Sequence, residues 1–146
     1  MKFDETPWNY PDIHKCKVAI IGLGYVGLPL AVEIAKRQKS YLTGENLERS
    51  VIGFDVDKKR IEELKRGFDR TNEVKSSQLL KNFGLTFSSN FEEIISAEIF
   101  IITVPTPIDE HKNPNLQALK DATIKVGKAL KFKKEKDSEC ENNVVP

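Results

Sequence analysis

Four short apolar runs recur along the chain, separated by stretches of helical or polar character. They are residues 17–21, 50–55, 85–87 and 99–104. Runs of this length that are rich in β-branched residues are typical of strands buried on both faces. The pattern therefore predicts strands at these four places, and the run 99–104 is the most hydrophobic of them.

Helical signals fill the intervals between the predicted strands. Apolar residues in 28–35 recur at helical spacing, and Asp57 and Asn115 can each cap a following helix. Gly67 can end the helix that follows Asp57, and Ser89 or Asn90 can cap a short helix near 91–95. Strand and helix therefore alternate, which predicts an α/β fold: a Rossmann-like doubly wound parallel sheet, truncated after its first half.

Composition excludes several classes of protein. The 146 residues suit one domain, and 39% hydrophobic with 31% charged residues is typical of a globular chain. Lys and Arg total 23 against 22 Asp and Glu, so no net field favours a nucleic-acid partner. No apolar run approaches the ~20 residues that span a bilayer, so no membrane partner is expected. Cys16 and Cys140 lack metal-ligand spacing, which predicts no metal site and favours a reducing cytoplasm.

The character of the chain changes at both ends. Residues 1–15 are expected to form an irregular arm, and 16–130 are expected to form the domain. Residues 131–146 are dominated by charged side chains, so this tail is expected to be a frayed helix or disordered.

A glycine-rich segment follows the first predicted strand directly and opens the first predicted helix. It reads Gly22-Leu23-Gly24-Tyr25-Val26-Gly27. In the dinucleotide-binding fingerprint the first glycine permits a tight turn, and the second lets the backbone approach a pyrophosphate. The third lets the helix pack closely, while free N–H groups at the helix start attract phosphate. The alternative is that the glycines serve only a strand-to-helix turn.

Asp55 ends the second predicted strand and is positioned to bind the ribose of adenosine. A carboxylate there repels a 2′-phosphate, which favours NAD over NADP. Asp55 lies 28 residues after Gly27, whereas ~20 are expected. A loop inserted at 38–49 accounts for the excess, because surface insertions cost little.

Several separated motifs carry a resemblance to a known family. The segments 18–31, 52–61 and 104–107 resemble the NAD-binding domain of the UDP-glucose/GDP-mannose dehydrogenase family. Within that family, residues 67–74, 105–108 and 113–116 are most similar to UDP-N-acetylglucosamine and UDP-N-acetylgalactosamine 6-dehydrogenases of the Vi polysaccharide biosynthesis type. The resemblance covers residues 16–130.

The resemblance implies a set of NAD-binding residues. They are Gly22, Leu23, Gly24, Tyr25, Val26, Gly27, Asp55, Arg60, Val104, Pro105 and Thr106. The glycine segment would hold the pyrophosphate, and Asp55 assisted by Arg60 would bind the adenosine ribose. Residues 104–106 would lie beside the nicotinamide half, at the carboxyl ends of the strands.

Members of this family oxidise the C6 alcohol of a nucleotide sugar to a uronic acid, by two hydride transfers to NAD through an essential cysteine. No counterpart of that cysteine or of the sugar domain is found, so no catalytic residue is expected. Cys140 lies between Glu139 and Glu141, and neighbouring carboxylates oppose thiolate formation. The resemblance thus implies a truncated or frame-shifted oxidoreductase, inactive alone.

Several interpretations of the chain's function stay open at this point. In the first, the chain is the cofactor half of a UDP-sugar dehydrogenase, and the sugar is bound only if a substrate domain is supplied elsewhere. It can form a homodimer or pair with a full-length dehydrogenase. It can also be a stand-alone nucleotide-binding or regulatory module, or a non-functional product. Similarity to other NAD enzymes, which act on hydroxyacids or hydroxyacyl-CoA, is a less favoured alternative, because it would leave residues 67–71 and 104–107 unexplained. Residues 70–73 can lie near the cofactor phosphates or at a subunit contact.

Overall fold

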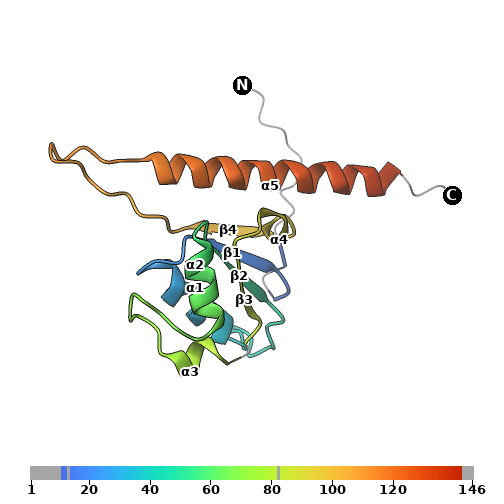
Figure 1. Ribbon diagram of the computed structural model, residues 1–146. Helices are drawn as coiled ribbons and strands as arrows, with labels where there is room; N and C mark the ends of the chain where they lie inside the picture. Colours follow the sequence, from blue (N-terminus) through green and yellow to red (C-terminus); the bar gives the residue numbers. More distant parts are fainter. Residues whose placement is uncertain (1–10, 13, 82, 143–146) are drawn as a thin grey trace.

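A four-stranded parallel sheet forms the centre of the protein in a computed structural model (Figure 1). The structure describes residues 11–142 apart from 13 and 82. The strands are β1 (Lys17–Ile21), β2 (Ser50–Phe54), β3 (Leu85–Ser88) and β4 (Ile99–Ile102), in the order β3-β2-β1-β4. Because all pairs are parallel, the carboxyl ends of β1, β2 and β4 lie at one edge. The expected α/β class is confirmed.

Helices cover both faces of this sheet. They are α1 (Gly27–Lys36), α2 (Lys58–Lys65), α3 (Ser76–Leu79), α4 (Phe91–Ile94) and α5 (Gln117–Asn142). In Figure 1, α1 and α2 lie on one side of the sheet, whereas α4 and α5 lie on the other. The short helix α3 was not expected, because residues 68–82 are mostly polar and the apolar pair Leu79 and Leu80 gives too little helical periodicity.

The capping residues act as the sequence predicts. The Asp57 side chain accepts hydrogen bonds from the backbone of Lys59 and Arg60 at the start of α2. Asn90 accepts one from the backbone of Glu92 at the start of α4. The Asn115 side chain accepts one from the backbone of Gln117, where α5 begins. Each side-chain acceptor satisfies an N–H group that the helix itself leaves unpaired.

Alternating residues of β1 divide the core between the two faces. Val18 and Ile20 pack in one buried cluster with residues of α1 and α2. Ala19 and Ile21 pack in a second cluster, which includes Ile94 of α4. A strand that is buried on both faces needs apolar residues at every position, which explains its unbroken apolar sequence.

Helix α5 runs past residue 130, where the charged tail was expected to begin. It continues to Asn142, so residues 131–142 are helical. These residues include no glycine or proline, and Lys131 lies 3.8 Å from Glu135 one turn later. Helix-forming residues therefore propagate the helix beyond its apolar face. The expected arm lies largely outside the described residues.

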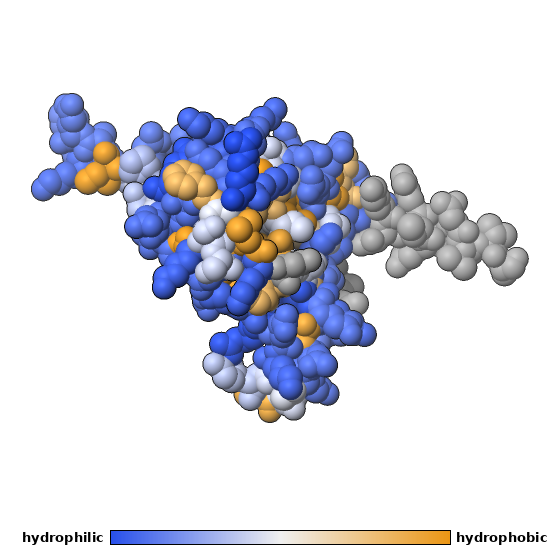
Figure 2. Space-filling view, turned by 60° about the horizontal axis from the view of Figure 1, so that its bottom comes forward, coloured by the Kyte–Doolittle hydropathy of each residue, from blue (hydrophilic) through white to orange (hydrophobic). Residues whose placement is uncertain are grey.

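The face drawn in Figure 2 is mainly hydrophilic. Figure 2 shows hydrophobic side chains in separate patches on the face that it draws. Residues 38–49 form the expected loop, with a single bridge between Lys39 and Asn46. Within the described part of the chain, no helix has the length and apolar character needed to cross a membrane.

Candidate functional site

A tight turn joins β1 to α1 at the carboxyl edge of the sheet. Gly22 has φ +97°, which side-chain-bearing residues rarely adopt, and a Cβ there would lie 3.1 Å from the carbonyl oxygen of Thr103. The Gly22 N–H donates to the carbonyl of Phe54 at 2.8 Å, so the turn is attached to the end of β2. A glycine is required here by both conformation and space.

Gly27 brings the start of α1 against this turn. A Cβ at Gly27 would overlap the carbonyl oxygen of Gly22 and the hydroxyl oxygen of Thr103. Thr103 follows β4, and its hydroxyl donates to the carbonyls of Ile21 at 3.1 Å and Gly22 at 2.8 Å. Thr103 therefore fixes the glycine turn. Sequence reasoning missed this role, because an apolar strand with one threonine carries no signal for it.

Gly24 leaves open space where the other two glycines are enclosed. A Cβ at this position would meet no atom within 4 Å. Within the described part of the chain, the N–H groups of Gly24, Tyr25 and Val26 donate to no protein acceptor. Unpaired N–H groups at a helix start are suited to an anion, and a glycine lets that anion approach. The turn therefore fits the pyrophosphate of a dinucleotide.

The Asp55 carboxylate lies directly beside this turn. Its Oδ2 accepts the N–H of Leu23 at 2.8 Å, and its Oδ1 accepts the N–H of Asp57 at 3.0 Å. These two bonds orient the carboxylate and leave further lone pairs on both oxygens. An oriented carboxylate with spare acceptor capacity fits a pair of ribose hydroxyls.

Arg60 is buried, with a side-chain exposure of 5%, and its polar atoms contact other groups of the protein. Its Nε donates to the carbonyl of Leu23 at 3.0 Å, and its Nη2 lies 2.8 Å from Oδ1 of Asp69. A contact between Arg60 and a ribose stays a prediction. The contacts that are present hold the glycine turn itself.

Asp69 is the most highly bonded carboxylate of this region. Burial raises its pKa, but hydrogen bonds from Thr71, Val74 and Arg60 outweigh burial and hold the pKa well below its ordinary value. Asp69 is therefore ionised at neutral pH, as a partner for the buried Arg60 must be.

Arg70 projects from the loop after α2 and is bound by two carboxylates. Its Nε lies 2.6 Å from Glu63 and its Nη2 lies 3.1 Å from Asp57. The Glu63 side chain is the main cause that raises the pKa of Arg70 above its ordinary value. This half-exposed guanidinium is thereby held at the margin of the site.

A cavity of about 680 Å³ brings these groups together. Its volume lies within the range of small-molecule and cofactor sites. The expected residues that line it are Gly22, Leu23, Gly24, Asp55, Arg60, Val104 and Pro105. The expected residues Tyr25, Val26, Gly27 and Thr106 are absent from its lining. Arg70 and Thr71, which were not among the expected NAD-binding residues, do line it.

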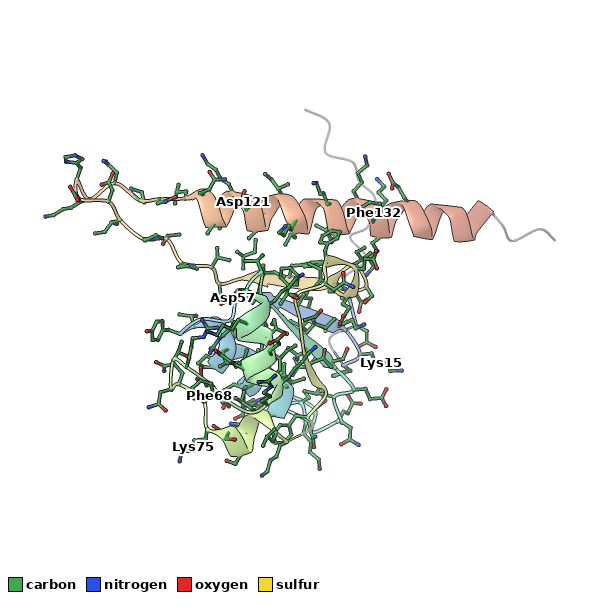
Figure 3. The ribbon with its side chains drawn as sticks, in the orientation of Figure 1. Lys15, Asp57, Phe68, Lys75, Asp121 and Phe132 are labelled. Atoms are coloured by element: carbon green, nitrogen blue, oxygen red, sulfur yellow. The ribbon has the colours of Figure 1, made fainter. Side chains whose placement is uncertain are left out.

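Helix α5 forms the opposite wall of this cavity. It contributes Ala118, Asp121, Ala122, Ile124, Lys125 and Lys128. Figure 3 shows Asp121 on α5 and Asp57 at the start of α2, the two elements between which the cavity lies. The spacing of three and four residues along α5 marks one helical face, but that pattern alone does not distinguish a cavity wall from core.

Other polar residues do not join this site. His111 and Asp109 belong to an exposed loop, where hydrogen bonds from the Asn113 backbone and side chain lower the pKa of Asp109. Cys16 is buried before β1, and burial is the main cause that raises its pKa. The Cys140 side chain lies outside the described residues. Among the described residues, no group of three His, Cys, Asp or Glu side chains could hold a metal ion.

The strand order, the glycine turn and the acidic end of β2 define a dinucleotide-binding domain of the Rossmann class. Comparison with known families is more specific. Residues 16–136 match the NAD binding domain of the UDP-glucose/GDP-mannose dehydrogenase family, and the chain belongs to that family. The resemblance seen in the sequence is confirmed.

Curated relatives are similar over most of this chain. A UDP-N-acetyl-D-glucosamine 6-dehydrogenase of Pseudomonas aeruginosa is 47% identical over 79% of the chain, which covers 25% of that protein. One of the same name from Salmonella typhi is 48% identical over 81% of the chain, again covering 25% of the relative. The chain therefore spans about a quarter of the length of these relatives.

Solved structures share the fold. An NDP-N-acetyl-D-galactosaminuronic acid dehydrogenase from Methanosarcina mazei superposes with a TM-score of 0.65 at 27% identity, over 79% of this chain and 25% of that one. A UDP-glucose dehydrogenase from Pyrobaculum islandicum gives 0.64 at 26% identity, over 89% and 28%.

Proposed function

We propose that this chain binds NAD in the cavity beside the glycine turn and is the cofactor-binding part of a nucleotide-sugar 6-dehydrogenase. One arrangement carries the proposal: unpaired N–H groups around an open Gly24, adjacent to the oriented carboxylate of Asp55. Together these groups supply a site for a pyrophosphate and a site for a ribose.

Each part of the site has a separate task. The N–H groups of Gly24, Tyr25 and Val26 bind the pyrophosphate, and Asp55 binds the adenosine ribose. Val104 and Pro105, together with the neighbouring Thr106, lie toward the nicotinamide half. When bound, NAD accepts a hydride; the chain's own residues bind and orient the cofactor for that purpose.

The substrate is a proposal of a different kind, because the chain spans about a quarter of its curated relatives. The names of two of those relatives specify a UDP-N-acetylated sugar and oxidation at its C6. We assign the same substrate class to the enzyme in which this domain works. The sugar site and the chemical step are then supplied by another polypeptide region, in a homodimer or with a full-length dehydrogenase.

The test is a calorimetric titration of the 146-residue chain with NAD and then NADP, with Asp55→Ala alongside. Losing a hydrogen bond to a charged group costs about 1.5–3 kcal/mol, so Asp55→Ala should weaken NAD binding roughly 10- to 150-fold. Asp55→Asn keeps an acceptor for Leu23 but removes the charge, so it should reduce the preference for NAD over NADP.

Asp109→Ala is the control, because Asp109 lies in an exposed loop and makes no contact with the cavity. It should bind NAD like the wild type. If the folded wild-type chain binds neither nucleotide, the proposed function is wrong.

A further inference from the structure

We propose that Asp69 is a positioning residue for pyrophosphate binding, acting through Arg60 on the backbone of Leu23. The inference deepens the proposed function and rests on it. It also makes the loop 69–74 part of the cofactor site, although this loop lies outside the glycine fingerprint.

The first step is the contact between Arg60 and the glycine turn. Both backbone groups of Leu23 are held: Asp55 accepts its N–H at 2.8 Å, and Nε of Arg60 donates to its carbonyl at 3.0 Å. The next residue is Gly24, whose N–H is one of those available to the pyrophosphate. Because the Leu23 carbonyl and the Gly24 N–H belong to one planar trans peptide and point in opposite directions, fixing that carbonyl also fixes the direction of the Gly24 N–H.

The second step is the pair that holds Arg60. Nη2 of Arg60 lies 2.8 Å from Oδ1 of Asp69, and the side chains are 5% and 1% exposed. An isolated buried guanidinium has a large desolvation cost, so Arg60 needs this carboxylate in order to stay in place. Removing the charge of Asp69 therefore removes the support that keeps Arg60 bonded to the Leu23 carbonyl.

The same carboxylate organises its own loop. Oδ1 accepts the N–H and hydroxyl of Thr71, and Oδ2 accepts the N–H groups of Glu73 and Val74. The loop includes Asn72 in the left-handed region, at φ 58°. Thr71 and its neighbour Arg70 line the cavity. The Asp69 carboxylate therefore connects two parts of the site. It bonds directly to Thr71 at the cavity margin, and through Arg60 it supports the glycine turn.

A purely stabilising role is a poor account of this pair. Desolvation offsets much of the attraction within a buried ion pair, and apolar replacements are often as stable. Moreover, Nη1 of Arg60 is buried and has no hydrogen-bond partner in the described part of the chain. An unsatisfied buried donor is destabilising. The Arg60–Asp69 pair is therefore not optimal for stability, yet it holds the carbonyl group of Leu23, whose peptide carries the Gly24 N–H.

The inference predicts different effects on ligands that contain a diphosphate and on ligands that lack one. Releasing the Leu23 carbonyl should weaken the binding of NAD and ADP, which both use the glycine turn. Adenosine does not use that turn, so its affinity should change little. A general loss of structure would weaken all three ligands together.

The test uses Arg60→Met combined with Asp69→Asn, which removes both charges and keeps one oxygen for the loop N–H groups. Calorimetry gives the Kd for NAD and ADP, NMR shifts give that for adenosine, and circular dichroism follows unfolding. We expect a folded chain whose Kd for NAD and ADP rises at least about tenfold while that for adenosine changes less than about twofold.

Arg60→Lys is the second variant, because it keeps the charge beside Asp69 but lacks the Nε donor to Leu23. It should fold and show the same selective loss, and it decides the matter if the double variant does not fold. Ile61→Val is the matched control: it disturbs the core on α2, with Ile61 4% exposed, without touching the turn.

An unchanged Kd for ADP in a folded variant overturns the inference, as does an equal loss for adenosine. Those results leave NAD binding by the wild type intact. Failure of the wild-type chain to bind NAD or ADP overturns the proposed function instead, so the two failures are distinguishable.

Discussion

Alanine substitutions at two glycines of the turn should separate binding from stability. Gly24 and Gly27 are three residues apart, yet their surroundings are opposite. A Cβ at Gly24 meets open space, whereas a Cβ at Gly27 overlaps the Gly22 carbonyl and the Thr103 hydroxyl. Gly24→Ala should therefore weaken NAD binding in a stable protein, and Gly27→Ala should destabilise the protein itself.

The magnitudes follow from these surroundings. Gly24 has no positive φ, so alanine fits its backbone, and stability should change by no more than about 1 kcal/mol. The new methyl group occupies the approach to the N–H groups, and losing one charge-assisted hydrogen bond costs about 1.5–3 kcal/mol, roughly 10- to 150-fold in Kd. At Gly27, overpacking against backbone should cost about 3 kcal/mol, at the upper end of the usual range.

Urea unfolding followed by circular dichroism gives the stabilities, and calorimetry gives the Kd for NAD. Gly127→Ala is the control, because Gly127 lies within α5 and a Cβ there also meets nothing within 4 Å. Its helix should gain roughly 1 kcal/mol with no change in affinity.

A stable Gly24→Ala protein that binds NAD like the wild type would refute the assignment of the turn to pyrophosphate. Equal stabilities for Gly24→Ala and Gly27→Ala would refute the packing argument for Gly27. The two outcomes are independent, because one concerns the open side of the turn and the other its enclosed side.

Two further predictions concern the groups around the turn. Thr103→Val removes the hydroxyl that donates to Ile21 and Gly22, so urea unfolding should show a loss of about 1 kcal/mol that Thr103→Ser largely avoids. Equal losses for both variants would contradict that role. Asp69 has a lowered pKa in the folded state, so its stabilising contribution is complete above its unfolded pKa of about 4 and is lost as the pH falls below it. Stability measured between about pH 6 and pH 2 should therefore fall less steeply for Asp69→Asn, and parallel curves would contradict this.

The sheet and the turn could be predicted from the sequence because their signals are local. Each strand is a short run of apolar residues, and a parallel strand buried on both faces permits little else. Asp57 and Asn90 cap helices through bonds that reach only two or three residues along the chain. The glycine turn is likewise local, and its position between a strand and a helix, with Asp55 at the end of the next strand, is the basis of its prediction as a pyrophosphate site.

The remaining features depend on contacts between distant residues. Helix α5 lines the cavity because of its position in the folded protein, which its own sequence does not specify. The hydrogen bond between Thr103 and Gly22 joins residues 81 positions apart. The length of α5 has a different origin: a charged stretch such as 131–142 is compatible with a frayed helix or with disorder, and Lys and Glu are good helix formers that let the helix continue to Asn142.

Arg60 shows how a correct motif can suggest an incomplete role. Its position after Asp55 indicates a basic group near the adenosine ribose, and Arg60 does line the cavity. Its hydrogen bonds, however, lead to the Leu23 carbonyl 37 positions earlier and to Thr71, beside Asp69, 11 positions later. A single sequence identifies a charged residue but not the partner that neutralises it. Because a buried charge requires such a partner, the Arg60 motif and the loop at 69–74 are one structural unit, although the sequence presents them as separate motifs.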